Sequence, residues 1–186
     1  DFQWKVNHKI DDYNSINFIG LGAIDDFSVE APDDFDFTQQ SFLEQVPIIQ
    51  QNSTTNGISW IRKFKEKKGQ FILALSTNKL KNIFSRYVDN ENLNGLYFRN
   101  DSHEWETKLR LKTVNYVNDW KISWGGNIQY SDYFNSTSDL YNQVEYVTKF
   151  NFYKYGLFGN ISKNFFENKL DVSIGIRTDE DSFSSG

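Results

Sequence analysis

Two glutamates, Glu104 and Glu106, are the carboxylate pair that best suits acid–base chemistry in this sequence. On an extended strand they share one face with Cα atoms about 6.5–7 Å apart, and paired carboxylates near this spacing serve glycoside hydrolysis. The same face continues with Lys108, Arg110 and Lys112, which we expect to pair with the glutamates across a wet lumen. We therefore interpret the row as polar surface and predict that the chain is not an enzyme.

Metal and nucleotide sites have little support. His8 and His103 are the only histidines and lie in separate segments, and the chain has no cysteine. The acidic segment 25–36 offers oxygen ligands for a divalent cation but lacks the spacing of an EF-hand, so an ion there stays an alternative. Gly20-Leu21-Gly22 does not continue into a phosphate-binding loop. We predict no metal and no cofactor.

A basic run covers residues 62–68, Arg-Lys-Phe-Lys-Glu-Lys-Lys. Nucleic acid is one interpretation of such a run, and a solvated turn is the other. The chain has 186 residues and a formal net charge of -5, which does not fit the basic surface of a duplex-binding protein. We therefore expect a turn and no nucleic acid.

The elements that position these residues are predicted to be strands. Aromatic residues make up 17% of the chain, and strands favour aromatic side chains. From Trp120 to Ser131 the even positions are mainly apolar and the odd positions are polar or glycine, which is the period of a two-sided strand. Similar alternation predicts about eight strands, near 2–9, 15–25, 57–65, 69–79, 104–112, 120–131, 150–162 and 170–177.

The connections between these strands fall into two kinds. Short polar turns are expected near 11–14, 66–69, 117–119 and 166–169, and long connections at about 26–56, 81–101 and 132–148, the first with a short helix over 38–49. Strict alternation of short and long connections is typical of an up-and-down barrel that crosses an outer membrane. The fold class that we predict is all-β, an antiparallel up-and-down meander that forms part of a larger transmembrane β-barrel.

Two environments explain strands with one apolar and one polar face. The apolar face meets lipid and the polar face a wet lumen, or the sheet is half-exposed in a soluble protein. No stretch reaches the ~20 consecutive apolar residues of a transmembrane helix. Aromatic residues at both ends of the 120–131 strand, Trp120 and Tyr130, fit the two aromatic girdles of a membrane barrel. We favour the membrane interpretation.

Two stretches resemble a known family. Residues 17–27, Asn-Phe-Ile-Gly-Leu-Gly-Ala-Ile-Asp-Asp-Phe, and residues 154–179, from Lys-Tyr-Gly-Leu-Phe to Gly-Ile-Arg-Thr-Asp, resemble barrel strands of Gram-negative TonB-dependent receptors. The second pattern is the more specific. The resemblance implies a plugged barrel of ~22 strands in the outer membrane that is energised through TonB.

The chain departs from the complete family pattern. It has no recognisable plug domain and no energy-coupling box, and its last residues, Phe183 to Gly186, lack the terminal aromatic of a finished barrel. We therefore expect residues 1–186 to be a single segment of the barrel domain, with the plug and the remaining strands absent. Its expected partners are the rest of the barrel, the plug, TonB, the lipid bilayer and a small-molecule or oligomeric substrate that the sequence does not identify.

The residues that we expect to face the lumen and contact the plug or the ligand are polar positions on three strands. They are Lys108, Arg110, Lys112, Lys121, Asn127, Gln129 and Arg177. Two alternatives to the receptor stay open: a complete small eight-stranded outer-membrane barrel, and a soluble β-sandwich that binds carbohydrate.

Overall fold

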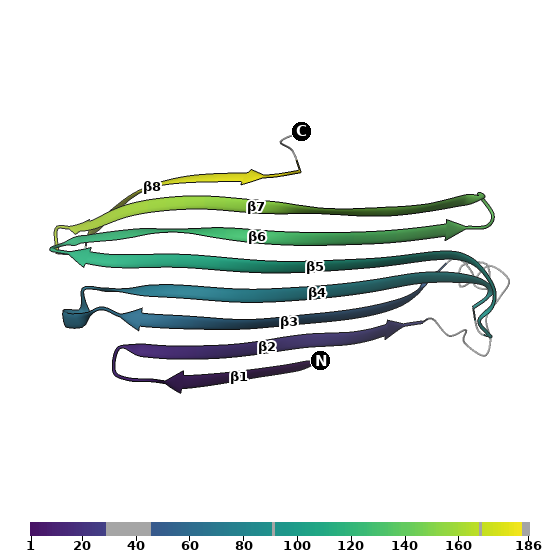
Figure 1. Ribbon diagram of the computed structural model, residues 1–186, viewed down its shortest axis with the longest axis horizontal. Coiled ribbons are helices and arrows are strands. Elements are labelled where there is room, and N and C mark those ends of the chain that lie inside the picture. Colours follow the sequence, from purple (N-terminus) through teal and green to yellow (C-terminus); the bar gives the residue numbers. More distant parts are fainter. Residues whose placement is uncertain (29–45, 91, 168, 184–186) are drawn as a thin grey trace.

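The computed structural model describes residues 1–28, 46–90, 92–167 and 169–183. They form one antiparallel sheet in which the strands follow each other in chain order (Figure 1). The strands are β1 (Phe2–Lys9), β2 (Asn14–Phe27), β3 (Ile48–Lys63), β4 (Gly69–Asp89), β5 (Asn94–Val117), β6 (Trp120–Asp139), β7 (Val144–Phe165) and β8 (Leu170–Asp181), with a turn of 3-10 helix, η1 (Lys65–Lys67), between β3 and β4. The predicted all-β meander of eight antiparallel strands is confirmed.

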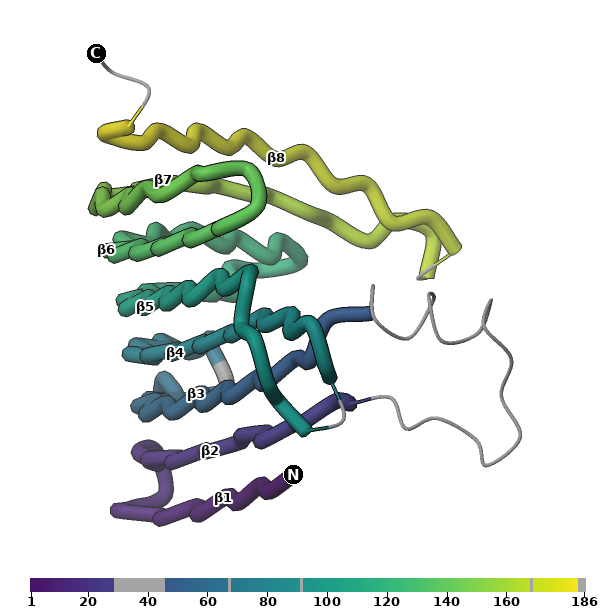
Figure 2. Tube along the Cα trace, turned by 90° about the vertical axis from the view of Figure 1, so that its right-hand side faces the viewer, coloured from purple at the N-terminus to yellow at the C-terminus, as the bar shows by residue number. Residues whose placement is uncertain are grey.

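The sheet is a single open layer. Viewed from the side, the strands form one stack with β1 and β8 at its two edges (Figure 2). Within the described ranges, β1 pairs only with β2 and β8 pairs only with β7, so the eight strands do not close on themselves. No helix in these ranges has the length and apolar character needed to cross a membrane.

Two of the three long connections that we predicted are wrong. Residues 81–101 belong mostly to β4 and β5, and residues 132–148 mostly to β6 and β7, so that only four residues separate the two strands in each case. The long connection predicted at 26–56 is shorter, because β2 continues to Phe27 and β3 already begins at Ile48. The predicted helix over 38–49 lies largely outside the described residues, and its last two positions belong to β3.

Three of the tight turns share the pattern Asp-x-x-Asn. The carboxylate of Asp11 accepts hydrogen bonds from the backbone N–H groups of Tyr13 and Asn14, both at 2.7 Å, and from the Asn14 amide. Asp139 accepts the same set from Tyr141 and Asn142. Asp89 likewise accepts the backbone N–H and side-chain amide of Asn92. These Asx turns bring antiparallel strands back at both ends of the sheet.

Residue pairing assigns each side chain to one of two faces. Cross-strand partners share a face and successive residues alternate between faces, so the registers place all five tryptophans, Trp4, Trp60, Trp105, Trp120 and Trp124, on one face. We call it the tryptophan face, and the opposite one, which carries Lys108, Arg110 and Gln129, the polar face.

Burial on the two faces is the reverse of that in a soluble protein. Trp120, Trp124 and Ile128 on the tryptophan face are 40%, 51% and 47% exposed, and no second layer of the described chain lies over them. Among the described residues Val114 is the only buried hydrophobic one, whereas six polar residues are buried. Four of these six lie on the polar face, namely Ser123, Gln129, Ser131 and Thr137.

β2 partly departs from this division because Ile19 and Leu21 lie on the polar face. The tryptophan face has Gly20 at this place, and the indole of Trp4 covers it from β1. A Cβ at Gly20 would lie 2.1 Å from Nε1 of Trp4. The glycine therefore admits the aromatic ring flat against the sheet, which extends the apolar surface to the edge strand.

We expect Asp139→Ala to increase hydrogen exchange of the Tyr141 and Asn142 amides severalfold, because both lose their acceptor. The pKa of Asp139 lies below its ordinary value, first because the Asn142 side chain donates to the carboxylate and then because backbone N–H groups do. Since the folded-state pKa is lowered, this protection is complete above the unfolded-state pKa and is lost as the pH falls through the folded-state value. Exchange followed by mass spectrometry between neutral and acid pH measures both effects.

Glu145→Gln is the matched control, because Glu145 lies on the same hairpin and its side chain forms no hydrogen bond or ion pair with the described residues. Equal exchange at residues 140–143 in Asp139→Ala and in the unchanged protein would show that the Asx turn does not hold this hairpin.

Candidate ligand-contact site

A hollow of about 310 Å³ lies where β5, β6, β7 and β8 run side by side. Of the residues that line it, four carry a positive charge and three carry a negative charge. The lining residues are Lys108, Arg110, Asn127, Gln129, Lys154, Tyr155, Arg177, Asp179, Glu180 and Asp181. Most belong to the polar face, so we call this the polar-face hollow.

All seven residues that we predicted to share a polar surface lie on the polar face. Five of them line the polar-face hollow: Lys108, Arg110, Asn127, Gln129 and Arg177. Lys112 and Lys121 do not line it, because they lie nearer the short-turn end, opposite Gly125 and Tyr116. Whether these residues contact a plug or a ligand stays a prediction.

A hydrogen-bond network holds the side chain of Gln129, one of the residues that line the hollow. The amide of Gln129, which is only 6% exposed, donates to a carboxylate oxygen of Glu106 and to Oγ of Ser131, the latter at 3.0 Å. The Ser131 hydroxyl also donates to Glu106 at 3.3 Å. Neighbouring strands are about 4.8 Å apart, closer than the next residue on the same face of one strand, so Glu106 finds its donors on β6.

The pairing that we predicted across a wet lumen stays a prediction, because the described sheet is open. Across the described residues neither Glu104 nor Glu106 forms an ion pair with Lys108, Arg110 or Lys112. The polar interpretation of the row stands, but the negative and positive halves of the row do not neutralise each other by contact. The three cations are therefore open to another anion.

Arg177 is held differently from the β5 cations. Its guanidinium donates through Nε and Nη2 to the two carboxylate oxygens of Asp179, with a distance of 2.7 Å for the Nη2 bond. Such a two-pronged pair is well oriented. Gly156 lies beside it, and a Cβ there would lie 2.3 Å from Oδ1 of Asp179. The missing side chain on β7 therefore makes room for the Arg177–Asp179 pair on β8.

Five residues that line the hollow were not among the predicted contacts, namely Lys154, Tyr155, Asp179, Glu180 and Asp181. Asp179 follows Arg177 by two positions, so the period of the strand was a usable signal for it. Lys154 lies on the second face of its strand, among Phe152 and Phe158, where mixed side chains blur the alternation. Only the pairing of β7 with β6 and β8 brings it next to Gln129.

An aromatic cluster borders the same region of the polar face. Tyr133 and Phe150 are cross-strand partners with ring centroids 5.0 Å apart. Phe150 stacks on Phe152 at 6.0 Å, and Phe183 contacts both. The polar face thus offers exposed cations, amides and aromatic rings within a few residues of each other, a mixture suited to contact with a polar ligand or another protein segment.

The remaining candidate sites do not assemble. The described residues hold no group of three or more His, Cys, Asp or Glu placed to bind a metal ion. His103 lies 2.9 Å from an oxygen of Asp101, far along the chain from His8. Asp25 and Asp26 are the part of the acidic segment that the structure describes, and they lie on opposite faces of β2.

No protein-family model matches the chain, and no curated protein sequence matches it.

We expect Gln129→Leu, which keeps the side-chain volume, to lower the free energy of unfolding by about 1–3 kcal/mol, because the Glu106 carboxylate and Ser131 hydroxyl lose a buried donor. Urea unfolding in detergent micelles measures the change. Asn160→Ala serves as the control, since Asn160 makes one exposed pair with Ser173 on the same face. Equal stability losses for the two variants would contradict the proposed role of the network.

Proposed function

We propose that this chain is a section of the wall of an outer-membrane β-barrel, and that the complete protein is a TonB-dependent receptor that takes up a ligand. The observation that carries the proposal is the division of the sheet into two faces. Apolar side chains stand exposed on the tryptophan face, while amides, carboxylates and cations fill the polar face. A closed barrel in lipid needs this partition, with its apolar surface outward.

The depth of the apolar surface supports the membrane assignment. On β5 it extends from Val117 to Trp105, interrupted by Asn115, Thr113 and Thr107, and on β6 it extends from Trp120 to Tyr130. Twelve residue steps on β5 measure about 40 Å along a strand, and a tilt of about 45° reduces this to roughly 28 Å across a membrane. A bilayer core is about 30 Å thick. We call this surface the apolar band.

Both margins of the apolar band carry a lysine over a tryptophan ring. At the short-turn margin Nζ of Lys163 lies 5.1 Å from the Trp120 ring centroid, and at the other margin Nζ of Lys79 lies 4.7 Å from that of Trp105. Tryptophan favours the boundary between lipid and water, and lysine side chains reach from apolar surface to the water. The two pairs therefore fit the two interfaces of one membrane.

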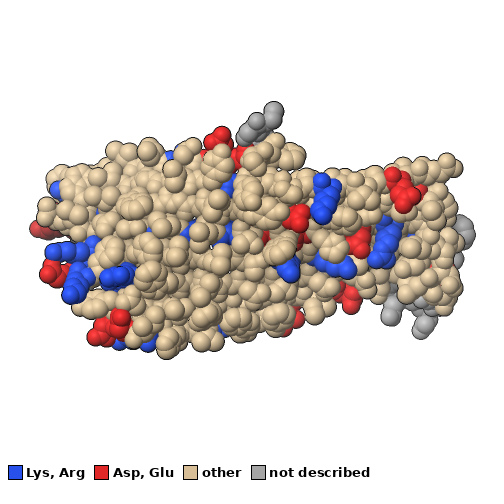
Figure 3. Space-filling model, in the orientation of Figure 1, with Lys and Arg blue, Asp and Glu red and all other residues tan. Residues whose placement is uncertain are grey.

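The distribution of charged residues along the strands also supports the membrane assignment. In the view of Figure 3 the surface next to the short turns has few charged residues until the turns themselves, and charged residues of both signs gather toward the other end. The register gives this pattern for the tryptophan face, where Lys79, Asp132 and Lys149 follow the apolar band. The strands β4 to β7 thus continue beyond the membrane into a polar environment.

The two alternative functions have less support. A soluble β-sandwich needs a second layer over Trp124 and Ile128, and the described chain provides none. A complete eight-stranded barrel needs β1 to pair with β8, and the sheet is open. An open sheet in lipid leaves unpaired backbone groups at both edges, so the proposal requires further strands beside β1 and β8.

The receptor part of the proposal rests on the resemblance of residues 17–27 and 154–179 to TonB-dependent receptors. The polar-face hollow fits it, because the cations Lys108 and Arg110 have no ion-pair partner among the described residues. In a plugged barrel such side chains face either the plug or the ligand. The residues that we propose for these contacts are the five predicted residues that line the hollow, Lys108, Arg110, Asn127, Gln129 and Arg177.

Spin labels on neighbouring residues test the wall. Because the chain lacks cysteine, Asn127→Cys and Ile128→Cys each provide one labelling site. In bilayers we expect the label at position 128 to collide with dissolved oxygen and the label at 127 with a water-soluble nickel complex, because these positions lie on opposite faces. Leu109→Cys and Arg110→Cys repeat the comparison on β5. Equal nickel accessibility at 127 and 128 would refute the membrane wall.

The receptor part has a separate test. The full-length protein that contains this segment should bind the immobilised C-terminal domain of TonB from the same bacterium, and deletion of its energy-coupling box should abolish the binding. If retention on the TonB domain does not depend on that box, the protein is not a TonB-dependent receptor, whereas the result of the spin-label experiment stands independently.

A further inference from the structure

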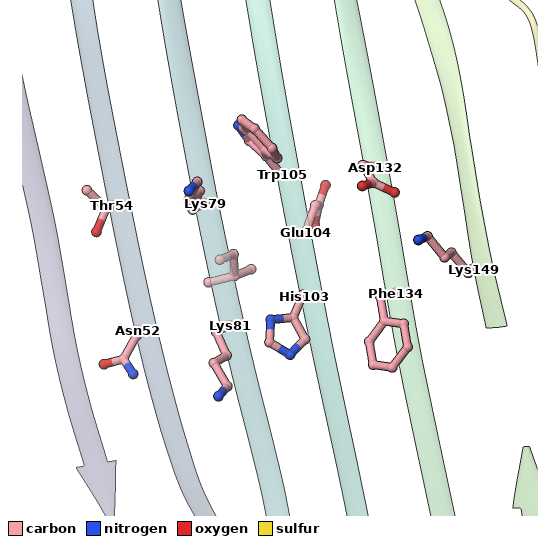
Figure 4. Close-up of a pocket in the computed structure, with 11 residues that line it drawn as sticks. Asn52, Thr54, Lys79, Lys81, His103, Glu104, Trp105, Asp132, Phe134 and Lys149 are labelled. Atoms are coloured by element: carbon pink, nitrogen blue, oxygen red, sulfur yellow. The ribbon is translucent and has the colours of Figure 1, made fainter. Parts of the chain in front are cut away.

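A second hollow, of about 450 Å³, lies just beyond the apolar band. Most residues that line it belong to two adjacent cross-strand rows of the tryptophan face, Thr54–Lys79–Trp105–Asp132 and Asn52–Lys81–His103–Phe134–Lys149 (Figure 4). We call it the tryptophan-face hollow. It starts at Trp105, the residue at which the apolar band ends, so a molecule lying on the band would reach it without leaving this face.

The tryptophan-face hollow has positive charge that the described residues do not neutralise. Lys79, Lys81 and Lys149 line it from β4 and β7, and none of them forms an ion pair with a described residue. Nζ of Lys79 lies over the Trp105 ring. Two carboxylates, Asp132 and Glu104, line the hollow as well, so the lysines exceed them by one charge.

The carboxylates are not arranged to neutralise the lysines. Glu104 lies on the polar face by its register with Tyr133. Oδ1 of Asp132 is buried without a hydrogen-bond partner in the described structure, and Asp132 forms no ion pair with a described lysine. Asp101, the next acidic residue on this face, is already paired with His103 at 2.9 Å and Arg99 at 3.5 Å.

We propose that the tryptophan-face hollow binds the phosphate groups of an anionic membrane lipid whose acyl chains lie on the apolar band. This inference rests on the proposed membrane wall. Lysines at the water side of an interface attract lipid phosphates, and Asn52 and Thr54 add polar partners for a sugar headgroup. Because β4 and β7 are three strand spacings apart, about 14 Å, a headgroup with two phosphates can engage Lys81 and Lys149 together.

The test uses the full-length protein in nonionic detergent at fixed salt. Its ligands are an acylated glucosamine disaccharide with two phosphates and the same lipid without phosphates, with inorganic phosphate as competitor. Native mass spectrometry measures the bound lipid. We expect the combined variant Lys79→Gln, Lys81→Gln and Lys149→Gln to weaken binding of the phosphorylated lipid on the order of 100-fold, since each lysine contributes about a factor of five, and to bind the unphosphorylated lipid as the unchanged protein does.

A control variant removes the same charge elsewhere. Lys5, Lys9 and Lys63 lie on the polar face, and replacing all three by Gln should leave lipid binding unchanged. The proposal is overturned if both triple variants bind alike, if the phosphorylated and unphosphorylated lipids bind equally, or if inorganic phosphate competes at the lipid's own concentration. The last result would assign the hollow to a free phosphate.

Quenching of tryptophan fluorescence by lipids with brominated acyl chains separates this inference from the proposed wall. If the tryptophans are quenched and the lysine variant keeps full affinity, only the headgroup site is wrong. If the tryptophans of the unchanged protein are not quenched, the membrane wall itself is wrong.

Discussion

An apolar sheet face with no second layer over it is the constraint on which the rest of the structure depends. Trp124 and Ile128 expose about half of their surface, and large exposed apolar patches are unfavourable in water unless something covers them. No helix and no second sheet of the described chain does so. The single layer, the glycine at position 20 that admits Trp4, and the lysine–tryptophan pairs at the margins are all understandable if lipid is the covering layer.

The backbone imposes a second requirement, which follows from the first. Within the sheet each inner strand is paired on both sides, so its N–H and C=O groups are satisfied even where hydrocarbon surrounds the wall. The outer edges of β1 and β8 are not paired with any described strand. In a membrane such edges are far costlier than in water, where solvent pairs with them. The proposed wall is therefore stable only when neighbouring strands complete it.

Sequence reasoning succeeded where the two faces differ and failed where they do not. The period-two pattern around Trp124 predicted the strand and the face of each residue, and the short turns were predicted at the right places. Beyond Ser131, Asp132 lies on the tryptophan face and Tyr133 on the polar face, so the contrast is lost although the strand continues to Asp139. The polar-face hollow is lined by four strands. Its cations on β5 could be predicted from one segment of the sequence, whereas the position of Lys154 could be assigned only from the register of β7.

The polar-face hollow and the apolar band lie on opposite faces of the same strands, and together they restrict what the polar face can contact. Asn127 and Gln129 flank Ile128 on β6. The polar-face hollow therefore lies at the same depth in the proposed membrane as the apolar band, on the opposite face of the sheet. Lys108 and Arg110 have no ion-pair partner among the described residues, and an uncompensated cation in a dry environment costs several kcal/mol. These cations are tolerable at this depth only if the polar face is wet or receives anionic groups from another part of the protein. A wall of this kind thus requires a lumen that is hydrated or filled with complementary polar residues, and that requirement makes the hollow the natural place for a plug or a ligand.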